Sequence, residues 1–290
     1  DYSATYVTVF TSDNNLKGFG IAFTIGKGND IVADCIKHFF PLFIGKTLDE
    51  LEKEIGKLWF QCVDHSQLRW LGPEKGVVHM AVAAIFNSLW DLIAKKNQKP
   101  LWQFVVDSKP DTIMEWLTFK YIEDALSRDE AYKILQDSQN TKEDRIKKIL
   151  NEGYPSYTTA AGWLGYSDEK IIEVCNQYMS QGWRHFKIKV GLDLEADVKR
   201  LELIRNTIGP DCSIMVDANQ QWSVKQSIEH INAYKKFNLL FVEEPTSPDD
   251  VMGFAKIKKE VGSVRLATGE ACGGRRMFKQ CLESGAVNVG

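Results

Sequence analysis

The sequence predicts an α/β protein in which an N-terminal α+β module precedes an incomplete (β/α)8 barrel of the TIM type. Strand and helix patterns alternate after residue 153, whereas the first hundred residues place a hairpin ahead of helices. Three apolar runs also end in carboxylates, at Asp217, Glu243 and Glu270, spaced 26 and 27 residues apart, and the first follows Lys189 by 28 residues. A strand, a loop, a helix and a return loop fit that interval, so the spacing indicates repeated strand–helix units.

Composition excludes several classes of protein. The 290 residues are 44% hydrophobic, which is enough for a substantial core, and the formal net charge is −3. Such a balance argues against a nucleic-acid partner, and no apolar run approaches the roughly 20 residues that cross a bilayer. Six scattered cysteines without a C-x-x-C pair indicate a reduced intracellular protein without a zinc site. The chain opens with Asp1 rather than Met, which leaves open a preceding targeting segment.

A hairpin is predicted at the start of the chain. The β-branched and aromatic stretches 4–11 and 18–25 flank the turn residues 12–15. Glycines nearby do not have the G-x-G-x-x-G spacing of a dinucleotide site. A phosphate loop ending at 45–47 would lack its first glycine.

Two helices are predicted after the hairpin. The first covers 47–60 and begins with Thr47 and Glu50 in the spacing of a capping box. The second covers the apolar stretch 77–95. His79 lies inside this stretch and is interpreted as a packed, hydrogen-bonded histidine rather than a ligand.

The domain junction is predicted within a charged region of weaker pattern. There, Ser127 and Glu130 suggest a capped helix, and 142–151 reads as an exposed charged helix. We therefore divide the chain into an α+β domain at 1–112, whose first strand we expect to precede residue 1, a connecting helical segment at 113–152, and the first five βα units of a barrel at 153–290.

In the predicted barrel half, turn and cap residues indicate where the helices and strands begin and end. Helices are expected at about 167–181, 194–208, 223–237, from 247–250 onward, and at 275–283; strands are expected at 157–161, at 186–190 and in the runs that end at the three carboxylates. Near-constant repeats with polar strand ends favour a closed barrel over an open doubly wound sheet. A barrel needs eight strands and five are visible, so we expect the sequence to be a fragment.

Two lysines on one strand suggest the chemistry. Lys187 and Lys189 share a face of the strand at 186–190, because side chains alternate along a strand. Two neighbouring ammonium groups repel, so a site that keeps both needs negative charge nearby. The three strand-end carboxylates supply it, since parallel barrel strands present their carboxyl ends at one face.

Three carboxylates at one place need a cation, and an all-oxygen ligand set favours Mg²⁺. We therefore predict Mg²⁺ held by Asp217, Glu243 and Glu270. Lys189 would then remove the proton next to a substrate carboxylate, and Lys187 would help to stabilise the negative charge that develops. Taken singly, strand-end acids are usually caps or surface charges, and we assign Glu244 and Asp249 to that kind.

Longer motifs resemble a known family. The K-x-K at 187–189, V-D-A-N at 216–219, E-E-P at 243–245 and T-G-E at 268–270 resemble the enolase superfamily, mandelate-racemase branch. That such sites pair a Lys or His base with Mg²⁺ is an established example of this chemistry. The closer resemblance is to L-fuconate dehydratases, a group that includes a mitochondrial animal protein, and it rests on D-Y-S-A at 1–4, R-W-L-G-P-E-K-G-V-V-H at 69–79, W-L-G-Y-S-D at 163–168 and E-E-P-T-S-P-D-D at 243–250.

The resemblance implies a capping domain, a barrel and a reaction. It makes Asp217, Glu243 and Glu270 the Mg²⁺ ligands and Lys189 the base that removes the C2 proton of a sugar acid. Substrate binding falls to Lys187, Asn219 and, from the capping domain, Tyr2. Loss of the 3-hydroxyl would convert L-fuconate into 2-keto-3-deoxy-L-fuconate, which makes the protein a hydro-lyase of sugar-acid catabolism, mitochondrial or cytosolic.

Part of the family's machinery is not expected in this chain. The resemblance places an Asp–His pair, whose His is the general acid, on later strands, so the fragment itself is expected to be inactive. Other acid-sugar dehydratases or epimerases share the metal and the K-x-K, and a non-catalytic truncated product is a third reading. The expected partner is a small-molecule sugar acid, and the sequence leaves a homo-oligomer open.

Overall fold

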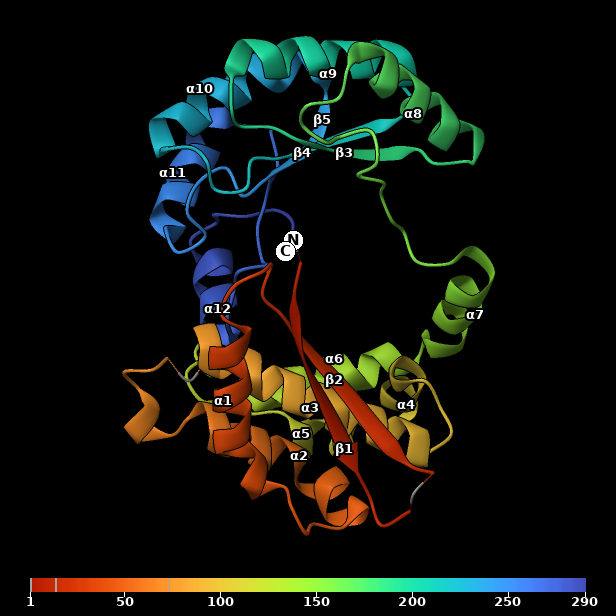
Figure 1. Cartoon of the computed structure of the whole chain (residues 1–290), viewed down its shortest axis with the longest axis vertical. Helices are drawn as coiled ribbons and strands as arrows, with labels where there is room; N and C mark the ends of the chain where they lie inside the picture. The colour runs from red at the N-terminus through yellow and green to blue at the C-terminus, as the bar shows by residue number, and fades with distance from the viewer. Residues whose placement is uncertain (1, 14, 73) are drawn as a thin grey trace. The chain divides into compact units, whose positions relative to one another are not determined.

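The computed structural model describes residues 2–13, 15–72 and 74–290, and its chain divides into two units, Asp1–Asn151 and Glu152–Gly290 (Figure 1). Each unit has its own buried core. In the first unit that core lies between a hairpin and helices, and in the second between a parallel sheet and helices.

The first unit is built on a hairpin that packs against a long helix. Strands β1 (Ala4–Phe10) and β2 (Lys17–Phe23) pair antiparallel, as predicted. The turn prediction at 12–15 includes Asn14, which lies outside the described residues. Gly18 and Gly20 face α3 (Gly76–Lys96), and a Cβ at Gly20 would lie 1.9 Å from the Ala84 carbonyl oxygen. Glycine therefore allows the hairpin and the helix to approach this closely.

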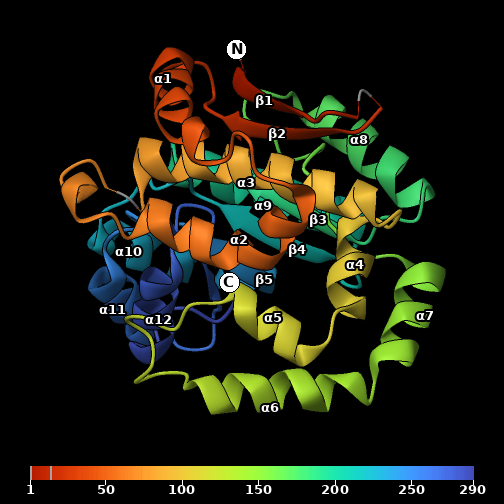
Figure 2. The same cartoon turned by 90° about the horizontal axis from the view of Figure 1, so that it is seen from below.

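The remaining elements of this unit are helices (Figure 2), and their bounds are α1 Asn29–Phe39, η1 Phe40–Leu42, α2 Leu48–Val63, η2 Ser66–Leu68, α4 Leu101–Asp107, α5 Pro110–Trp116, α6 Arg128–Gln139 and α7 Lys142–Glu152. The predicted capping boxes are confirmed: Thr47 with Glu50 begins α2, and Ser127 with Glu130 begins α6. The sequence pattern missed α1, α4 and α5. Two of these are seven-residue helices, too short for a clear helical period.

The apolar sequence of α3 is explained by its burial within the first unit. By length and composition alone it could cross a membrane, contrary to the expectation that no apolar run approaches that length, and most of it is buried within its unit. His79 packs there as expected, but its buried Nδ1 has no hydrogen-bond partner, contrary to the prediction. Burial lowers the pKa of His79, against the opposing charge of Glu74. A neutral imidazole is the form that this environment favours.

The second unit is a parallel sheet with helices along one side (Figure 1). The strand order is β3-β4-β5-β6, and the bounds are β3 His185–Lys189, β4 Ser213–Asp217, β5 Leu239–Glu243 and β6 Leu266–Ala267. The helices are α8 Asp168–Ser180, α9 Leu194–Ile208, α10 Val224–Tyr234, η3 Lys235–Phe237, α11 Val251–Val261 and α12 Arg275–Glu283. The alternation of strands and helices is as predicted, and these four strands do not close into a barrel.

Two predicted strands differ from the structure. The stretch 157–161 is not a strand, because Thr158 forms only an isolated bridge, to Phe186. β6 has two residues, so Glu270 lies beyond it in a turn.

The helix starts follow their caps. Ser167 caps α8, and Ser223 with Gln226 forms a capping box at α10, as predicted. α11 begins later than expected, at Val251, because the Asp250 side chain caps it by accepting from the Gly253 amide at 2.8 Å. Pro248 therefore precedes the helix and does not lie in its first turn.

Candidate active site at the strand ends

The carboxyl ends of the parallel strands bring most of the predicted residues together. The register pairs Lys189 with Asp217, Asp217 with Glu243, and Glu243 with Ala267. These four positions form one row across the sheet. Because parallel pairing places the ends of neighbouring strands side by side, the row was foreseeable from the repeat length.

Lys187 lies between two of the predicted metal ligands. Its Nζ donates to Glu243 Oε2 at 2.7 Å and lies 3.4 Å from Asp217 Oδ2. The side chain is only 8% exposed, so its charge is compensated by these carboxylates rather than by water. Burial acts to lower the pKa of Lys187, but the hydrogen bonds to Glu243 and Tyr157 and the nearby negative charges outweigh it and raise the pKa. These contacts therefore stabilise the charged form of Lys187.

Lys189 lies nearer to solvent on the same face. Its Nζ donates to Asp217 Oδ2 at 2.6 Å and to Asn219 Oδ1 at 2.8 Å, and its side chain is 22% exposed. The backbone amide of Asn219 in turn donates to Asp217 Oδ1 at 2.9 Å. Asp217, at 2% exposure, thus orients both the lysine amine and the asparagine that follows β4.

Glu270 follows Ala267, the last position of the row, by three residues. Glu270 is exposed in the turn after β6. Among residues 2–13, 15–72 and 74–290, no group of three or more His, Cys, Asp or Glu side chains is close enough to hold a metal ion. Tyr2 belongs to the first unit, where its 73% exposed ring lies 5.6 Å from that of Phe23.

The sequence analysis missed a buried acid beside the row. Glu244 is 4% exposed, so its interpretation as a cap or surface charge is wrong. Gln220 Nε2 donates to Glu244 Oε2 at 2.9 Å, while Glu244 Oε1 is buried without a hydrogen-bond partner. Burial raises the pKa of Glu244, and the charges of Glu270, Asp217 and Glu243 raise it further, against the effect of the Gln220 hydrogen bond. The doubled acid of the E-E-P motif was the available signal.

The backbone around this row is strained. Asn219, Gln220 and Glu244 have φ angles of 44°, 67° and 39°, which non-glycine residues rarely adopt. Such conformations persist where surrounding contacts hold them, and they concentrate at functional sites. Here they follow the two strands that carry Asp217 and Glu243.

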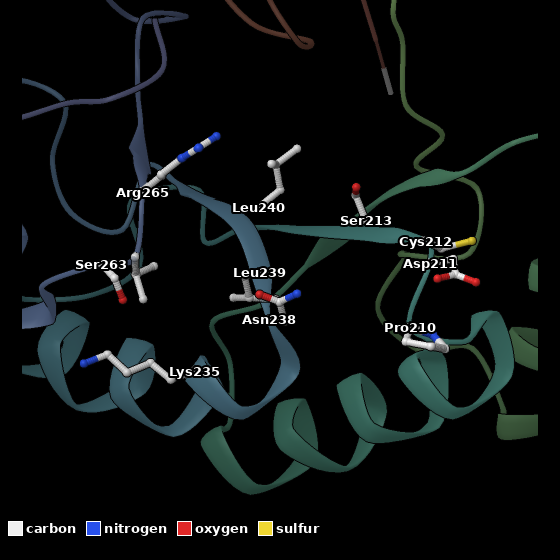
Figure 3. A pocket seen from close by; sticks show the side chains of 11 residues that line it. Pro210, Asp211, Cys212, Ser213, Lys235, Asn238, Leu239, Leu240, Ser263 and Arg265 are labelled. Carbon is white, nitrogen blue, oxygen red and sulfur yellow. The ribbon is translucent and has the colours of Figure 1, made fainter.

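A pocket lies at the opposite, amino-terminal ends of β4 to β6 (Figure 3), but its charged side chains do not converge as those at the carboxyl ends do. Its volume is about 460 Å³, and its lining includes Asp211, Lys235 and Arg265. Figure 3 shows the Lys235 and Arg265 side chains pointing in different directions, away from one another. The polar groups of this pocket do not meet at a common point, so we place the site at the carboxyl ends.

Comparison with known proteins identifies both units. Residues 2–105 match the mandelate racemase/muconate lactonizing enzyme N-terminal domain, and residues 170–290 match the enolase C-terminal domain-like family. The chain is 46% identical to mitochondrial enolase superfamily member 1 of Xenopus laevis over 99% of this chain and 65% of that protein. It is 43% identical to the L-galactonate dehydratase of Hypocrea jecorina over 100% of this chain and 65% of that protein.

Solved structures show the same similarity. The crystal structure of human mitochondrial enolase superfamily member 1 superposes with a TM-score of 0.95 at 43% identity and covers 99% of this chain and 66% of that one. A Streptomyces coelicolor racemase with bound magnesium gives a TM-score of 0.72 at 25% identity, with 99% and 66% covered. The chain thus spans about two thirds of the length of these relatives.

Proposed function

Because the chain belongs to the enolase superfamily, with both the N-terminal and the C-terminal domains of its mandelate-racemase branch, we propose that its function is the Mg²⁺-dependent dehydration of a sugar acid. The observation that carries this proposal is the position of Lys189. Its amine lies at the carboxyl edge of a parallel sheet, between Asp217 and Asn219, and is partly open to solvent. Catalytic groups of parallel barrels come from this edge.

The two lysines suit different tasks. Lys189, as the free amine, takes the proton from C2 of the substrate, with Asp217 and Asn219 setting the direction of its Nζ. Lys187, whose pKa is raised, stays charged and suits binding of the substrate carboxylate, as does the Asn219 amide. Loss of the C2 proton and of the 3-hydroxyl, which leaves as water, gives an enol that becomes a 2-keto-3-deoxy acid. Tyr2 is proposed to contact the substrate from the capping domain.

The donor set at the strand ends fits Mg²⁺. Asp217 and Glu243 already converge on one cation, the Lys187 ammonium, and a further carboxylate oxygen, Glu244 Oε1, is buried without a partner. Asp217, Glu243 and Glu270 would hold the metal, which when bound stabilises negative charge on the substrate carboxylate as the C2 proton leaves. Racemase and dehydratase structures in this superfamily contain magnesium.

The substrate proposed is L-fuconate, with L-galactonate as the second candidate. L-Fuconate is L-galactonate without the 6-hydroxyl, so the two acids present the same groups from C1 to C5. A relative 43% identical to this chain is named L-galactonate dehydratase, which favours this shared configuration. We also propose an intracellular protein, mitochondrial or cytosolic, in keeping with its free thiols and with the name of several relatives.

The test separates proton removal from dehydration. In a full-length form of the protein, incubated with Mg²⁺ and L-fuconate or L-galactonate in deuterated water, we expect exchange of the C2 proton, which NMR follows. Lys189→Ala should lower the rate by at least a thousandfold, because the other amine near Asp217, that of Lys187, is held in its charged form by Glu243. Lys199→Ala, on the exposed side of α9, is the matched control and should exchange at the wild-type rate.

Product analysis distinguishes the alternatives. A 2-keto-3-deoxy acid identifies a dehydratase, and an epimer of the starting acid identifies an epimerase. Exchange by Lys189→Ala at the wild-type rate would contradict the assignment of the base. Absence of exchange with every acid tested would favour a non-catalytic product.

A further inference from the structure

We propose that Arg200 and Asp197, two residues of α9, are positioning residues for Lys189. They bind the backbone at Lys189 and Gly191, so they fix where the Lys189 amine lies relative to Asp217 and Asn219. Their effect on proton removal rests on the function proposed above. Their effect on the position of the amine does not.

Arg200 holds the peptide that leaves Lys189. Its Nη2 donates to the Lys189 carbonyl oxygen and, at 2.9 Å, to Asp197 Oδ1. Its Nη1 reaches the carbonyl oxygens of Trp163 at 3.3 Å and Gly162 at 3.5 Å. Gly162 also accepts from the Lys189 amide at 2.9 Å. The guanidinium therefore ties together the two backbone segments that meet at Lys189, a geometry that its planar set of donors allows.

Asp197 holds the next turn of the chain. Its Oδ2 accepts from the Gly191 amide at 2.7 Å and from the Tyr234 hydroxyl at 3.2 Å, while Oδ1 binds Arg200. Asp197 is 2% exposed and Tyr234 is fully buried. A buried carboxylate with these three donors is fully compensated, so removal of one donor is costly and the arrangement is rigid.

The backbone segments on either side of Lys189 are closely packed at two glycines, Gly162 and Gly191. A Cβ at Gly162 would lie 2.3 Å from the Lys187 carbonyl oxygen. Gly191 has a φ of 123°, and a Cβ there would lie 3.2 Å from Gln221. The backbone segments on both sides of Lys189 therefore pack directly against their neighbours. Small movements of Arg200 or Asp197 must be transmitted to Lys189, because packed segments do not deform continuously.

Lys187 serves as an internal control for displacement of Lys189. It lies within β3, paired with Met215 of β4, and its amide donates to the Thr158 carbonyl at 2.9 Å. Among the contacts described above, no side chain of α9 binds the backbone of Lys187. Loss of the Arg200 contacts should therefore displace Lys189 and leave Lys187 in place.

The first experiment measures the position of the amine without any reaction of a sugar acid. Each lysine in wild type, Arg200→Lys and Asp193→Ala is acetylated with a limiting reagent, and the rates are read by peptide mass spectrometry. Arg200→Lys keeps the positive charge beside Asp197 but loses the planar donors. Asp193→Ala removes the N-cap of the same helix, where Asp193 accepts from the Ala196 amide at 2.8 Å, and is the control for general destabilisation of α9.

We expect acetylation of Lys189 to rise at least threefold in Arg200→Lys, because its amine no longer lies against Asp217 and Asn219. The Lys187 rate should stay within twofold, and both rates should stay within twofold in Asp193→Ala. Equal Lys189 rates in Arg200→Lys and Asp193→Ala would overturn the proposal, as would an equal rise at both lysines.

The second experiment measures C2 proton exchange in the full-length form of the protein. In Arg200→Lys we expect kcat to fall at least tenfold with KM within twofold, since substrate binding is retained while the base is displaced. Asp193→Ala should keep both parameters within twofold. Wild-type protein that exchanges no proton counts against the proposed function, and the acetylation rates still decide the positioning role. Exchange with an unchanged kcat in Arg200→Lys contradicts that role directly.

Discussion

At the scale of single residues, the site depends on Asp217. Its side chain is 2% exposed, and its two oxygens accept from the Lys189 amine and from the backbone amide of Asn219, while the Lys187 Nζ lies 3.4 Å away. Removing a buried partner of this kind leaves uncompensated charges and is strongly unfavourable. The same carboxylate is one of the three proposed metal ligands, so its removal should affect both stability and metal binding.

We predict that Asp217→Asn weakens Mg²⁺ binding at least tenfold, because the amide keeps the shape of the side chain but loses its charge. Isothermal titration calorimetry measures the affinity. Asp211→Asn, at the exposed opposite end of β4, is the matched control and should bind Mg²⁺ as the wild type does. An affinity unchanged by Asp217→Asn would remove this residue from the metal site.

At the scale of elements, contacts between strand and helix backbones determine the first unit. A Cβ at Gly18 would lie 2.1 Å from the Ser88 carbonyl oxygen, and one at Gly20 would lie 1.9 Å from that of Ala84. Both neighbours are backbone atoms of α3, which cannot rotate away as a side chain would. The hairpin and α3 therefore tolerate no added methyl group at these two positions without moving apart.

We predict that Gly20→Ala lowers the free energy of unfolding of the first unit by about 1–3 kcal/mol, the usual range for overpacking. Urea denaturation followed by circular dichroism measures it. Lys17→Ala, on the same strand with an exposed side chain, should change the value by less than about 0.5 kcal/mol. A Gly20→Ala protein as stable as Lys17→Ala would show that the hairpin does not pack this closely on α3.

At the scale of the whole molecule, the chain consists of two units with separate hydrophobic cores, divided after Asn151. The chain that follows α7, residues 153–157, is exposed and has no regular secondary structure. Segments of this kind open locally and are the preferred sites of proteolysis.

We predict that a glutamate-specific protease first cuts after Glu152, the last residue of α7, because the chain beyond it is irregular and exposed. Mass spectrometry should show fragments of residues 1–152 and 153–290 at early times. Glu152→Gln should slow the first cut at least fivefold. Early cuts within α9 or α10 would contradict the division into two compact units.

Local patterns in the sequence determined a large part of this structure. The hairpin, the capped starts of α2, α6, α8 and α10, and the alternation of strands and helices all follow from periodicity and from side chains that bind the backbone nearby. The same local logic placed Lys189 beside Asp217, because equal repeats end parallel strands in one row. These features need no information about distant contacts.

Only the tertiary structure decided how the charged groups are compensated. It placed Lys187 between Asp217 and Glu243, buried Glu244, left Glu270 in a turn beyond the short β6, and set Arg200 on the Lys189 carbonyl. The physical reason is that burial and ion pairing depend on the packing of segments far apart in the chain. A sequence pattern reports which face of a strand a side chain takes, whereas packing determines which partner it meets there.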